Sequence, residues 1–357
     1  MLLQSVLVCH DEKKFMGFPA NAGLWWWDDE ILAAFYAGDY DEDALTHKVD
    51  LGRPIVIGLA RSLDAGKTWQ VEMGNEINAV SNRAPVPIPR EGIHFAHPHF
   101  ALKVGRASIR IHSDTFMVSY DRGHTWQGPY LLPEAPDEIT ARTDYIVESD
   151  SSCMMMLSHR DERVPCTHHP DRAYAVRTDD GGRTWRQLGY ITDMQARSVM
   201  PCTVRMSDGR LITALSRRRD LEPVRAVDWR EAKTDNWIEV RESTDGGQTW
   251  GFLSRIDATW NMTYPYGNPV ALSRLPDGRM IMFFGRRTQD ARLVGIISAD
   301  GGRTWSEDIV LAEGFTSSDM GYPRVANLRF GKMVIVFYGA TERRPQEHIE
   351  AVRWMLD

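Results

Sequence analysis

The chain has 357 residues, of which 43% are hydrophobic and 25% are charged, so it can enclose a large apolar core. Its formal net charge of −7, with acidic and basic residues interspersed, argues against a nucleic-acid partner, which requires a basic face. No apolar run approaches the roughly 20 residues that span a bilayer, and the N-terminal segment lacks the basic lead of a signal peptide. We therefore expect a globular protein with no nucleic-acid or membrane partner, cytoplasmic as given or secreted if a leader has been trimmed.

The cysteines do not suggest a disulfide framework or a metal site. Cys9, Cys153, Cys166 and Cys202 are widely spaced and form no CxxC pair. The histidine pair after Cys166, in CTHHPDR, lacks a fourth ligand at a suitable spacing for zinc. The sequence predicts neither a metal nor another cofactor.

Five octets repeat along the chain, each after a short run rich in β-branched and aromatic residues. In chain order they are SLDAGKTW (62–69), SYDRGHTW (119–126), TDDGGRTW (178–185), STDGGQTW (243–250) and SADGGRTW (298–305). Asp and Ser or Thr hydrogen-bond the backbone around a turn, and Gly supplies a positive φ. The Trp covers an apolar seam while its N–H finds an acceptor. Each octet therefore predicts a turn that closes a hairpin, with its Trp fastening one sheet.

A second signal lies between the octets, where another strand is predicted to begin. It occurs six times, as GFPA (17–20), AHPH (96–99), RTDY (142–145), VMPC (199–202), GNPV (267–270) and GYPR (321–324). Several copies lead through an apolar strand to a tight turn, and Asp208-Gly209 and Asp277-Gly278 are strong hairpin signals. Each unit therefore reads as strand, turn, strand, loop, strand, octet, strand.

Six such units, none able to bury both of its faces alone, predict an all-β, six-bladed β-propeller with four-stranded antiparallel blades. The propeller is expected to occupy residues 1–357 as a single domain. The last unit has no octet because the chain ends just after its third strand. The N-terminal segment LLQSVLVC (2–9) is predicted to supply its fourth strand and to close the ring.

The octets match the Asp-box, or BNR, repeat of the sialidase (neuraminidase) superfamily, which the chain resembles in repeat spacing across nearly its whole length. The resemblance implies the same propeller fold. In that superfamily the Asp boxes lie on the rim away from the catalytic face, so the octets indicate shape, and function has to be argued from the site.

Arginines gather where the predicted pocket lies. The innermost strands of a propeller converge on its axis, so first-strand starts and second-strand ends should surround one pocket. Second strands end in LSHR, LSRRR and FGRR in three successive units. Guanidinium groups bind carboxylates bidentately and keep their charge, as a pocket for an acidic sugar requires. The predicted substrate-binding arginines are Arg160, Arg217, Arg218, Arg286 and Arg287, with Arg160, Arg217 and Arg286 as the anion clamp.

Two features leave this arginine prediction open. Strand alternation lets only one residue of each adjacent pair point inward. The alternative is that the arginines are solvated loop charges that pair with nearby acids on the surface.

The resemblance to sialidases also implies catalytic residues. Sialidases hold the substrate carboxylate with three arginines, attack with a Tyr activated by a Glu, and protonate the leaving group with an Asp. Tyr322 matches the position of the nucleophile. Asp39, the acid nearest the end of the first unit's second strand, is the predicted general acid. The chain departs from the family at Phe18, where an Arg is expected, and at Met200, where the activating Glu is expected.

Three further residues are predicted to line the pocket. Asp144 begins the third inner strand, where a carboxylate beside arginines would stay ionised and act as base or nucleophile, unless it only caps a turn. His97, on the same strand face as His99, offers acid and base chemistry near neutral pH. Tyr266 offers a face on which a sugar ring can stack.

Together these residues predict an exo-acting glycoside hydrolase that resembles a sialidase and releases a terminal acidic sugar from a glycan. The sugar would be a sialic acid or a related ulosonate or uronate. Two other classes stay open. One is a polysaccharide lyase, in which Arg neutralises a uronate and His or Tyr removes the adjacent proton. The other is a glycan-binding propeller without catalysis, which the missing Arg and Glu would suit.

Overall fold

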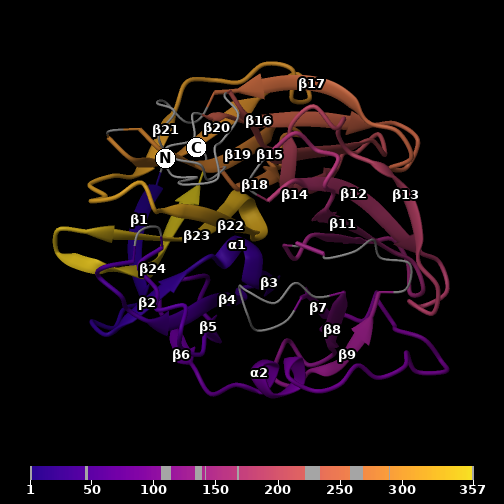
Figure 1. Cartoon of the computed structure of the whole chain (residues 1–357), viewed down its shortest axis with the longest axis horizontal. Helices are drawn as coiled ribbons and strands as arrows, with labels where there is room; N and C mark the ends of the chain where they lie inside the picture. The colour runs from indigo at the N-terminus through magenta and orange to yellow at the C-terminus, as the bar shows by residue number, and fades with distance from the viewer. Residues whose placement is uncertain are drawn as a thin grey trace.

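The computed structural model describes residues 2–44, 47–105, 114–132, 139–140, 142–166, 169–221, 234–257, 268–288 and 290–355. Six antiparallel sheets are arranged around a central axis, and Figure 1 shows this ring along the shortest dimension of the molecule. The predicted six-bladed β-propeller is thereby confirmed. Among the described residues, no helix has the length and apolar character needed to cross a membrane.

The first blade contains β2 (Lys14–Gly17), α1 (Pro19–Ala22), β3 (Gly23–Trp27), β4 (Glu30–Asp39), β5 (Val56–Ser62) and β6 (Gln70–Glu72). Its innermost strand is split, because β2 and β3 both pair with β4 and the single turn of α1 lies between them. A short helix, α2 (Glu76–Ser81), leads to the second blade, which contains β7 (Ala101–Val104), β8 (Thr115–Ser119) and β9 (Gln127–Leu131).

The other four blades have four strands each, in the order predicted from the repeats. The third contains β10 (Tyr145–Val147), β11 (Cys153–Arg160), β12 (Asp171–Thr178) and β13 (Arg186–Tyr190). The fourth contains β14 (Arg197–Arg205), β15 (Leu211–Asp220), β16 (Thr234–Ser243) and β17 (Gly251–Ile256). The fifth contains β18 (Val270–Arg274), β19 (Met280–Arg286), β20 (Arg292–Ser298) and β21 (Ile309–Ala312). The sixth contains β22 (Gly321–Asn327), the 3-10 turn η2 (Arg329–Gly331), β23 (Lys332–Thr341), β24 (Arg344–Met355) and β1 (Leu2–Cys9).

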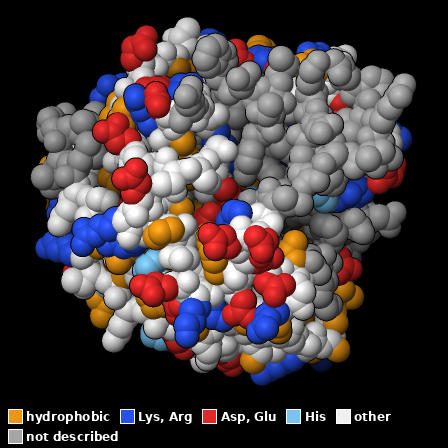
Figure 2. Space-filling model, turned by 60° about the vertical axis from the view of Figure 1, so that its left-hand side comes forward, with side chains coloured by type: hydrophobic (Ala, Val, Ile, Leu, Met, Phe, Trp, Pro, Cys, Tyr) orange, Lys and Arg blue, Asp and Glu red, His pale blue; other side chains and the backbone are white. Residues whose placement is uncertain are grey.

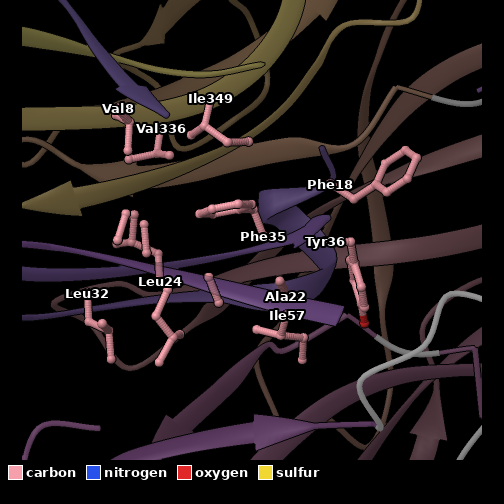
Figure 3. Close-up of a cluster of buried hydrophobic side chains, with 14 of the residues drawn as sticks. Val8, Phe18, Ala22, Leu24, Leu32, Phe35, Tyr36, Ile57, Val336 and Ile349 are labelled. Carbon is pink, nitrogen blue, oxygen red and sulfur yellow. The ribbon is translucent and has the colours of Figure 1, made fainter. Parts of the chain in front are cut away.

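The N-terminal strand closes the ring. β1 pairs with β24, with Leu2 opposite Met355 and Leu7 opposite Glu350, as predicted. Figure 1 shows the indigo β1 beside the yellow β24. Figure 3 shows Val8 next to Val336 and Ile349 of the sixth blade, with Phe35 of the first blade facing them. Because this seam is buried from both sides, closure removes apolar surface from water as well as pairing an exposed edge.

The second blade differs from the prediction. β7 pairs directly with β8, with Ala101 opposite Ser119, the first residue of the second octet. The segment AHPH therefore lies at the octet end of the blade, where it leads into a strand that runs toward the opposite face. AHPH does lead into the first strand of this three-stranded sheet, but it lies at the opposite face from the predicted pocket, because the pairing partner of a strand fixes its direction.

The octets form the predicted turns. In the fourth blade, Asp245 Oδ1 accepts hydrogen bonds from the backbone N–H groups of Gln248 (3.1 Å) and Thr249 (2.9 Å), and Oδ2 accepts from Thr249 Oγ1 (2.6 Å). The Ser243 hydroxyl donates to the same carboxylate and accepts a hydrogen bond from the N–H of Gly247. Gly247 has a φ of 92°. These bonds hold the pKa of Asp245 down to about 2.

The tryptophans of the octets find acceptors in four cases. In three octets the indole N–H donates to the backbone carbonyl of the Gly three residues earlier, as seen for Trp69, Trp126 and Trp250. The indole N–H of Trp305 donates instead to Ser254 Oγ. Trp185 Nε1 has no acceptor among the described residues, so the prediction fails there.

Figure 2 shows acidic and basic side chains interspersed on one side of the molecule.

Replacing one octet carboxylate should destabilise the fold. We expect Asp245→Asn to lower the free energy of unfolding at pH 7 by about 1 kcal/mol, since hydrogen bonds to a charged group are lost from a solvent-facing turn. Because folding lowers the pKa of Asp245 from 3.8 to about 2, its contribution should be complete above pH 4 and disappear as the pH falls toward 2. Urea unfolding at pH 7 and at pH 3 measures the difference. Asp257→Asn, at an exposed carboxylate bonded only to Arg255 among the described residues, is the control. An equal effect of both substitutions would contradict the role of the octet.

Candidate functional site

The innermost strands of three blades share an unusual backbone step. Phe18, Met200 and Tyr322 have φ angles of 59°, 57° and 48°, and each precedes a proline. In β14 and β22 the pairing register shifts at this step. A left-handed conformation is strained for residues other than glycine and persists where the surroundings enforce it, commonly at functional sites. The step places the side chains of Phe18 and Tyr322, from the first and sixth blades, in contact.

A cluster of aromatic and charged side chains surrounds Tyr322. We define the Tyr322 cluster as Phe18, His47, Arg287, Asp319, Tyr322, Tyr338 and Glu347. The ring of Phe18 lies 4.6 Å from that of His47 and 5.2 Å from that of Tyr322, measured between centroids. The guanidinium carbon of Arg287 lies 5.3 Å from the centroid of the Tyr322 ring, and its Nη2 donates to the Met320 carbonyl at 2.8 Å.

Asp319 is the ionised acid of the cluster. Only 3% of the residue is exposed, and its two carboxylate oxygens lie 2.9 and 3.0 Å from Nδ1 of His47. The Tyr338 hydroxyl donates to the same carboxylate. Burial alone would raise the pKa of Asp319, but His47, Tyr338 and the positive charge of Arg287 together lower it below its usual value.

Glu347 is the acid of the cluster whose pKa is raised. It begins the inward-facing part of β24 and is 2% exposed, and its Oε2 has no hydrogen-bond partner among the described residues. Burial and the negative charge of Asp319 raise the pKa of Glu347 to about 7. The cluster therefore contains two acids whose surroundings shift their pKa values in opposite directions.

Tyr322 lies within this cluster as a neutral phenol. Burial raises its pKa, and the positive charges of Arg287 and Arg197 oppose that shift. The same two cations would stabilise negative charge on the phenolic oxygen if it formed during a reaction.

The structure brings one arginine of the pair at the end of β19 into the cluster. Arg286 forms a forked ion pair with Asp308, at 2.5 and 2.6 Å, and donates to the Asp257 carbonyl. Arg287 instead lies over Tyr322. Adjacent residues of a strand face opposite ways, so the anion-clamp role predicted for Arg286 is not supported by its position.

The other predicted clamp arginines are paired within the protein. Arg160 lies 3.4 Å from Asp171 and contacts His169 Nδ1 at 2.8 Å. The buried Arg217 contacts Asp193 at 2.7 Å and Glu239 at 3.3 Å. Arg218 is also buried, and its Nη2 donates to Cys166 Sγ at 2.9 Å. Asp193 and Glu239 thus compensate the charge of Arg217. Asp171 is instead shared between Arg160 and Arg197, whose Nη2 it contacts at 2.6 Å.

Asp39 has surroundings that do not suit a general acid. The β2–β4 register places Lys14 directly opposite, and the Lys14 ammonium lies 2.5 Å from the Asp39 carboxylate. Arg53 adds a second contact at 3.3 Å. Both cations lower the pKa of Asp39, whereas a proton donor requires a raised one. The position of Asp39 does not favour the predicted general-acid role, which stays a prediction.

Asp144 belongs to a second charged group deeper in the hub. Arg142 is fully buried and donates from Nη1 to the carbonyls of Met200 (3.3 Å) and Val270 (2.8 Å), which belong to the fourth and fifth blades. Burial raises the pKa of Asp144 to about 6, although Arg142 and Arg324 oppose the shift. The carboxyl is thus less readily ionised than the sequence suggested. It lines a cavity that does not include Tyr322.

His97 lies away from the hub. Its ring contacts that of Tyr120 at 5.3 Å, and His99 Nε2 lies 3.2 Å from Arg122, within the second octet. This position follows from the β7–β8 pairing and places His97 outside the Tyr322 cluster, so its predicted role stays a prediction. Tyr266 lies outside the described residues, and its predicted role stays a prediction.

Sequence reasoning missed three members of the cluster. His47 lies in the connection after β4, Asp319 lies three residues before Tyr322, and Glu347 lies in β24. Asp319 had a usable signal, because it lies two residues before the first residue of GYPR. His47 and Glu347 had none that distinguished them from surface residues. Among the described residues, no group of three or more His, Cys, Asp or Glu side chains is arranged to hold a metal ion.

Comparisons with known proteins agree with this architecture. The sequence profile of the BNR repeat-like domain family matches residues 100–335, more than half of the chain. A sialidase from Micromonospora viridifaciens is 23% identical over 349 residues, covering 88% of this chain and 48% of that protein. The chain thus spans about half the length of this curated relative.

Two solved structures are similar over nearly their whole lengths. A Dyadobacter fermentans protein of unknown function superposes with a TM-score of 0.72 at 17% identity, covering 99% of both chains. A Penicillium chrysogenum alpha-L-arabinanase complexed with arabinobiose superposes with a TM-score of 0.60 at 12% identity, covering 99% of this chain and 98% of that one. At these identities the likeness is one of fold. With its profile match and its ring of octet-bearing blades, the chain belongs to the BNR repeat-like family of the sialidase superfamily.

Proposed function

We propose that the protein is an exo-acting glycoside hydrolase that uses the Tyr322 cluster to release a terminal acidic sugar from a glycan. The observation that carries the proposal is the opposite pKa shifts of Asp319 and Glu347 within one buried cluster. A pair of acids held in different protonation states at the same pH is the usual signature of acid and base roles in glycoside hydrolysis.

The residues of the cluster suit distinct roles. Glu347 would protonate the departing glycosidic oxygen, since its carboxyl keeps a proton near neutral pH. Tyr322 would attack the anomeric carbon while its proton passes to Asp319. Water would then release the sugar from Tyr322, with Glu347 as the base. Arg287 would stabilise the phenolate and the developing charge around it.

Arg287 also supports an acidic substrate. It is the arginine that contacts the proposed nucleophile, and a guanidinium can bind a carboxylate with two parallel hydrogen bonds. A carboxylate held there would position the adjacent anomeric carbon near Tyr322. The specific acid, a sialic acid or a uronic acid, is part of the proposal.

A neutral terminal sugar is the second candidate. It is favoured because the three arginines of the predicted clamp, Arg160, Arg217 and Arg286, are each paired with an Asp or Glu. The similar arabinanase structure contains arabinobiose, whose rings carry no carboxylate. Both candidate functions use Glu347 as the acid and Tyr322 as the nucleophile. They differ in the role of Arg287, which would bind the substrate carboxylate of an acidic sugar but would only support Tyr322 with a neutral one.

Removing the phenolic oxygen should stop turnover. We expect Tyr322→Phe to lower kcat by at least about a thousandfold on whichever chromogenic sialoside, uronide or arabinofuranoside the protein cleaves. The thermal midpoint should change little, because the ring contacts with Phe18 and Tyr338 remain. Tyr174→Phe is a matched control, because the buried hydroxyl of Tyr174 has no partner among the described residues. If Tyr322→Phe keeps more than a tenth of the activity, Tyr322 is not the nucleophile.

Binding of glycans without any turnover by the unmodified protein would instead indicate a lectin-like role.

Activity should depend on a group that titrates near pH 7. Because Glu347 has to be protonated to act as the acid, kcat/KM should fall as the pH rises through about 7. Glu347→Gln should lower the rate by about a hundredfold and remove this alkaline limb. Initial rates from pH 5 to 9 measure both effects. Glu342→Gln, on the exposed turn after β23, should leave the profile unchanged. An alkaline limb that survives in Glu347→Gln would assign it to another group.

The role of Arg287 separates the two substrate classes. If the sugar is acidic, Arg287→Met should lower kcat/KM on the acidic glycoside by about a hundredfold or more, since a charged hydrogen-bonded pair is lost. On a neutral arabinofuranoside the loss should be within about threefold. Arg286→Met is the matched neighbour, because Arg286 pairs with Asp308. Equal losses on both substrate classes would favour the neutral sugar and leave Arg287 as a support for Tyr322.

A further inference from the structure

The hub contains a cavity of about 460 Å³ that is separate from the Tyr322 cluster. Its wall is formed by the ends of four inner strands, β3, β14, β18 and β22, together with residues 143–145. β14 and β18 end in the hairpins at Asp208-Gly209 and Asp277-Gly278, so this wall lies toward the face that carries the octets. None of Tyr322, Arg287, Asp319 or Glu347 belongs to it. The volume is within the usual range for a site that holds a small molecule.

The floor of the cavity carries buried polar atoms without partners. Asp144 is 6% exposed; its Oδ1 accepts a 3.5 Å bond from the Thr203 N–H, the Thr203 side chain also stabilises the carboxylate, and Oδ2 has no partner among the described residues. Arg324 lines the same space, and its Nε also has none. Buried polar groups are normally hydrogen-bonded, so exceptions on residues that line a cavity point to a ligand.

Positive charge exceeds negative charge around this space. Arg324 and Arg274 line the cavity, and Arg142 lies directly behind Asp144. Arg274 donates from Nη1 to the Arg205 carbonyl, while its Nε has no partner among the described residues. Arg205 is compensated by Glu148. A single carboxyl, Asp144, therefore faces several guanidinium groups, and a bound anion would balance them.

One wall of the cavity is aromatic. Trp25 is fixed by a hydrogen bond from Nε1 to the Leu102 carbonyl (3.1 Å) and by contact with the ring of Trp126. Trp26, which is 42% exposed, and Trp27 also line the cavity. Flat, half-exposed indole rings suit the apolar face of a sugar-sized ring. Asn327, whose amide donates to the Arg274 carbonyl at 2.8 Å, leaves its oxygen as an acceptor for a hydroxyl.

We propose that this cavity, which we name the hairpin-face cavity, is a second binding site for a small organic carboxylate about the size of a monosaccharide. Arg324 and Arg274 bind the carboxylate, Trp26 contacts the ring, and Asp144 and Asn327 accept hydroxyl donors. The site is independent of the proposed catalysis and does not require it. Its ligand is either an acidic monosaccharide or an acyclic organic acid, since both carry the carboxylate that the arginines recognise.

Titration of the full chain with three probes tests the proposal, with intrinsic Trp fluorescence and calorimetry as readouts. D-glucuronate should bind, D-glucose should bind at least about tenfold more weakly, and Arg274→Met should weaken glucuronate by a similar factor. Trp26→Ala should also weaken glucuronate, and its exposed side chain makes misfolding an insufficient explanation. Arg279→Met, on the adjacent hairpin and paired with Asp277, should have no effect.

The remaining arms identify the source of the carboxylate and separate this site from the catalytic cluster. Succinate that binds as tightly as glucuronate would assign the site to acyclic acids, and much weaker succinate binding would assign it to acidic sugars. Tyr322→Phe should bind glucuronate normally at this site even if it loses all turnover. Equal binding of glucose and glucuronate, or no binding of any probe, would overturn the proposal.

Discussion

The pairing of β1 with β24 determines the rest of the structure. Each sheet has two apolar faces, and a ring covers all of them only when its last blade is complete. The N-terminal strand completes that blade and places the first blade against the sixth. His47 and Asp319, which are 272 positions apart in the sequence, are in contact only because of this closure. The candidate site is therefore located at the seam where the ring closes.

Electrostatics at this seam select one acid to be charged and one to be neutral. Two buried carboxyl groups near each other do not both ionise readily, because like charges repel strongly away from water. His47, Tyr338 and Arg287 lie around Asp319 and stabilise its negative charge. Around Glu347, Lys48 and a backbone hydrogen bond oppose the rise in pKa, but burial and the charge of Asp319 outweigh them. Elsewhere in the hub, Arg142 bonds the carbonyls of two other blades.

Local patterns predicted the parts of the fold that local chemistry controls. The octets, the Asp-Gly hairpins and the closing strand could be predicted because each depends on residues that are adjacent in the sequence or on a simple strand pattern. Tyr322 could be located from the GYPR motif, although its proposed role still needs an experiment. Asp319, three residues upstream, could have been found by the same motif.

Other features could not be predicted, because they depend on pairing partners. The choice between Arg286 and Arg287 follows from which way β19 faces, and the ion pairs of Asp39 follow from the β2–β4 register. AHPH was assigned to the wrong end of its blade because β7 pairs with β8. His47 joins the cluster through ring closure, and Glu347 joins it through the pairing of β24 with β23. No local window of sequence contains either contact.

The central claim is that their surroundings shift the pKa values of Asp319 and Glu347 in opposite directions, and that the charge of Asp319 contributes to the rise at Glu347. Carbon-13 NMR titration of the carboxyl groups, in the unmodified protein and in Asp319→Asn, measures this directly. The account predicts that Glu347 titrates at about pH 7 and that its pKa falls when the charge of Asp319 is removed. A Glu347 carboxyl that titrates near its ordinary value of about 4.3 in both proteins would contradict it.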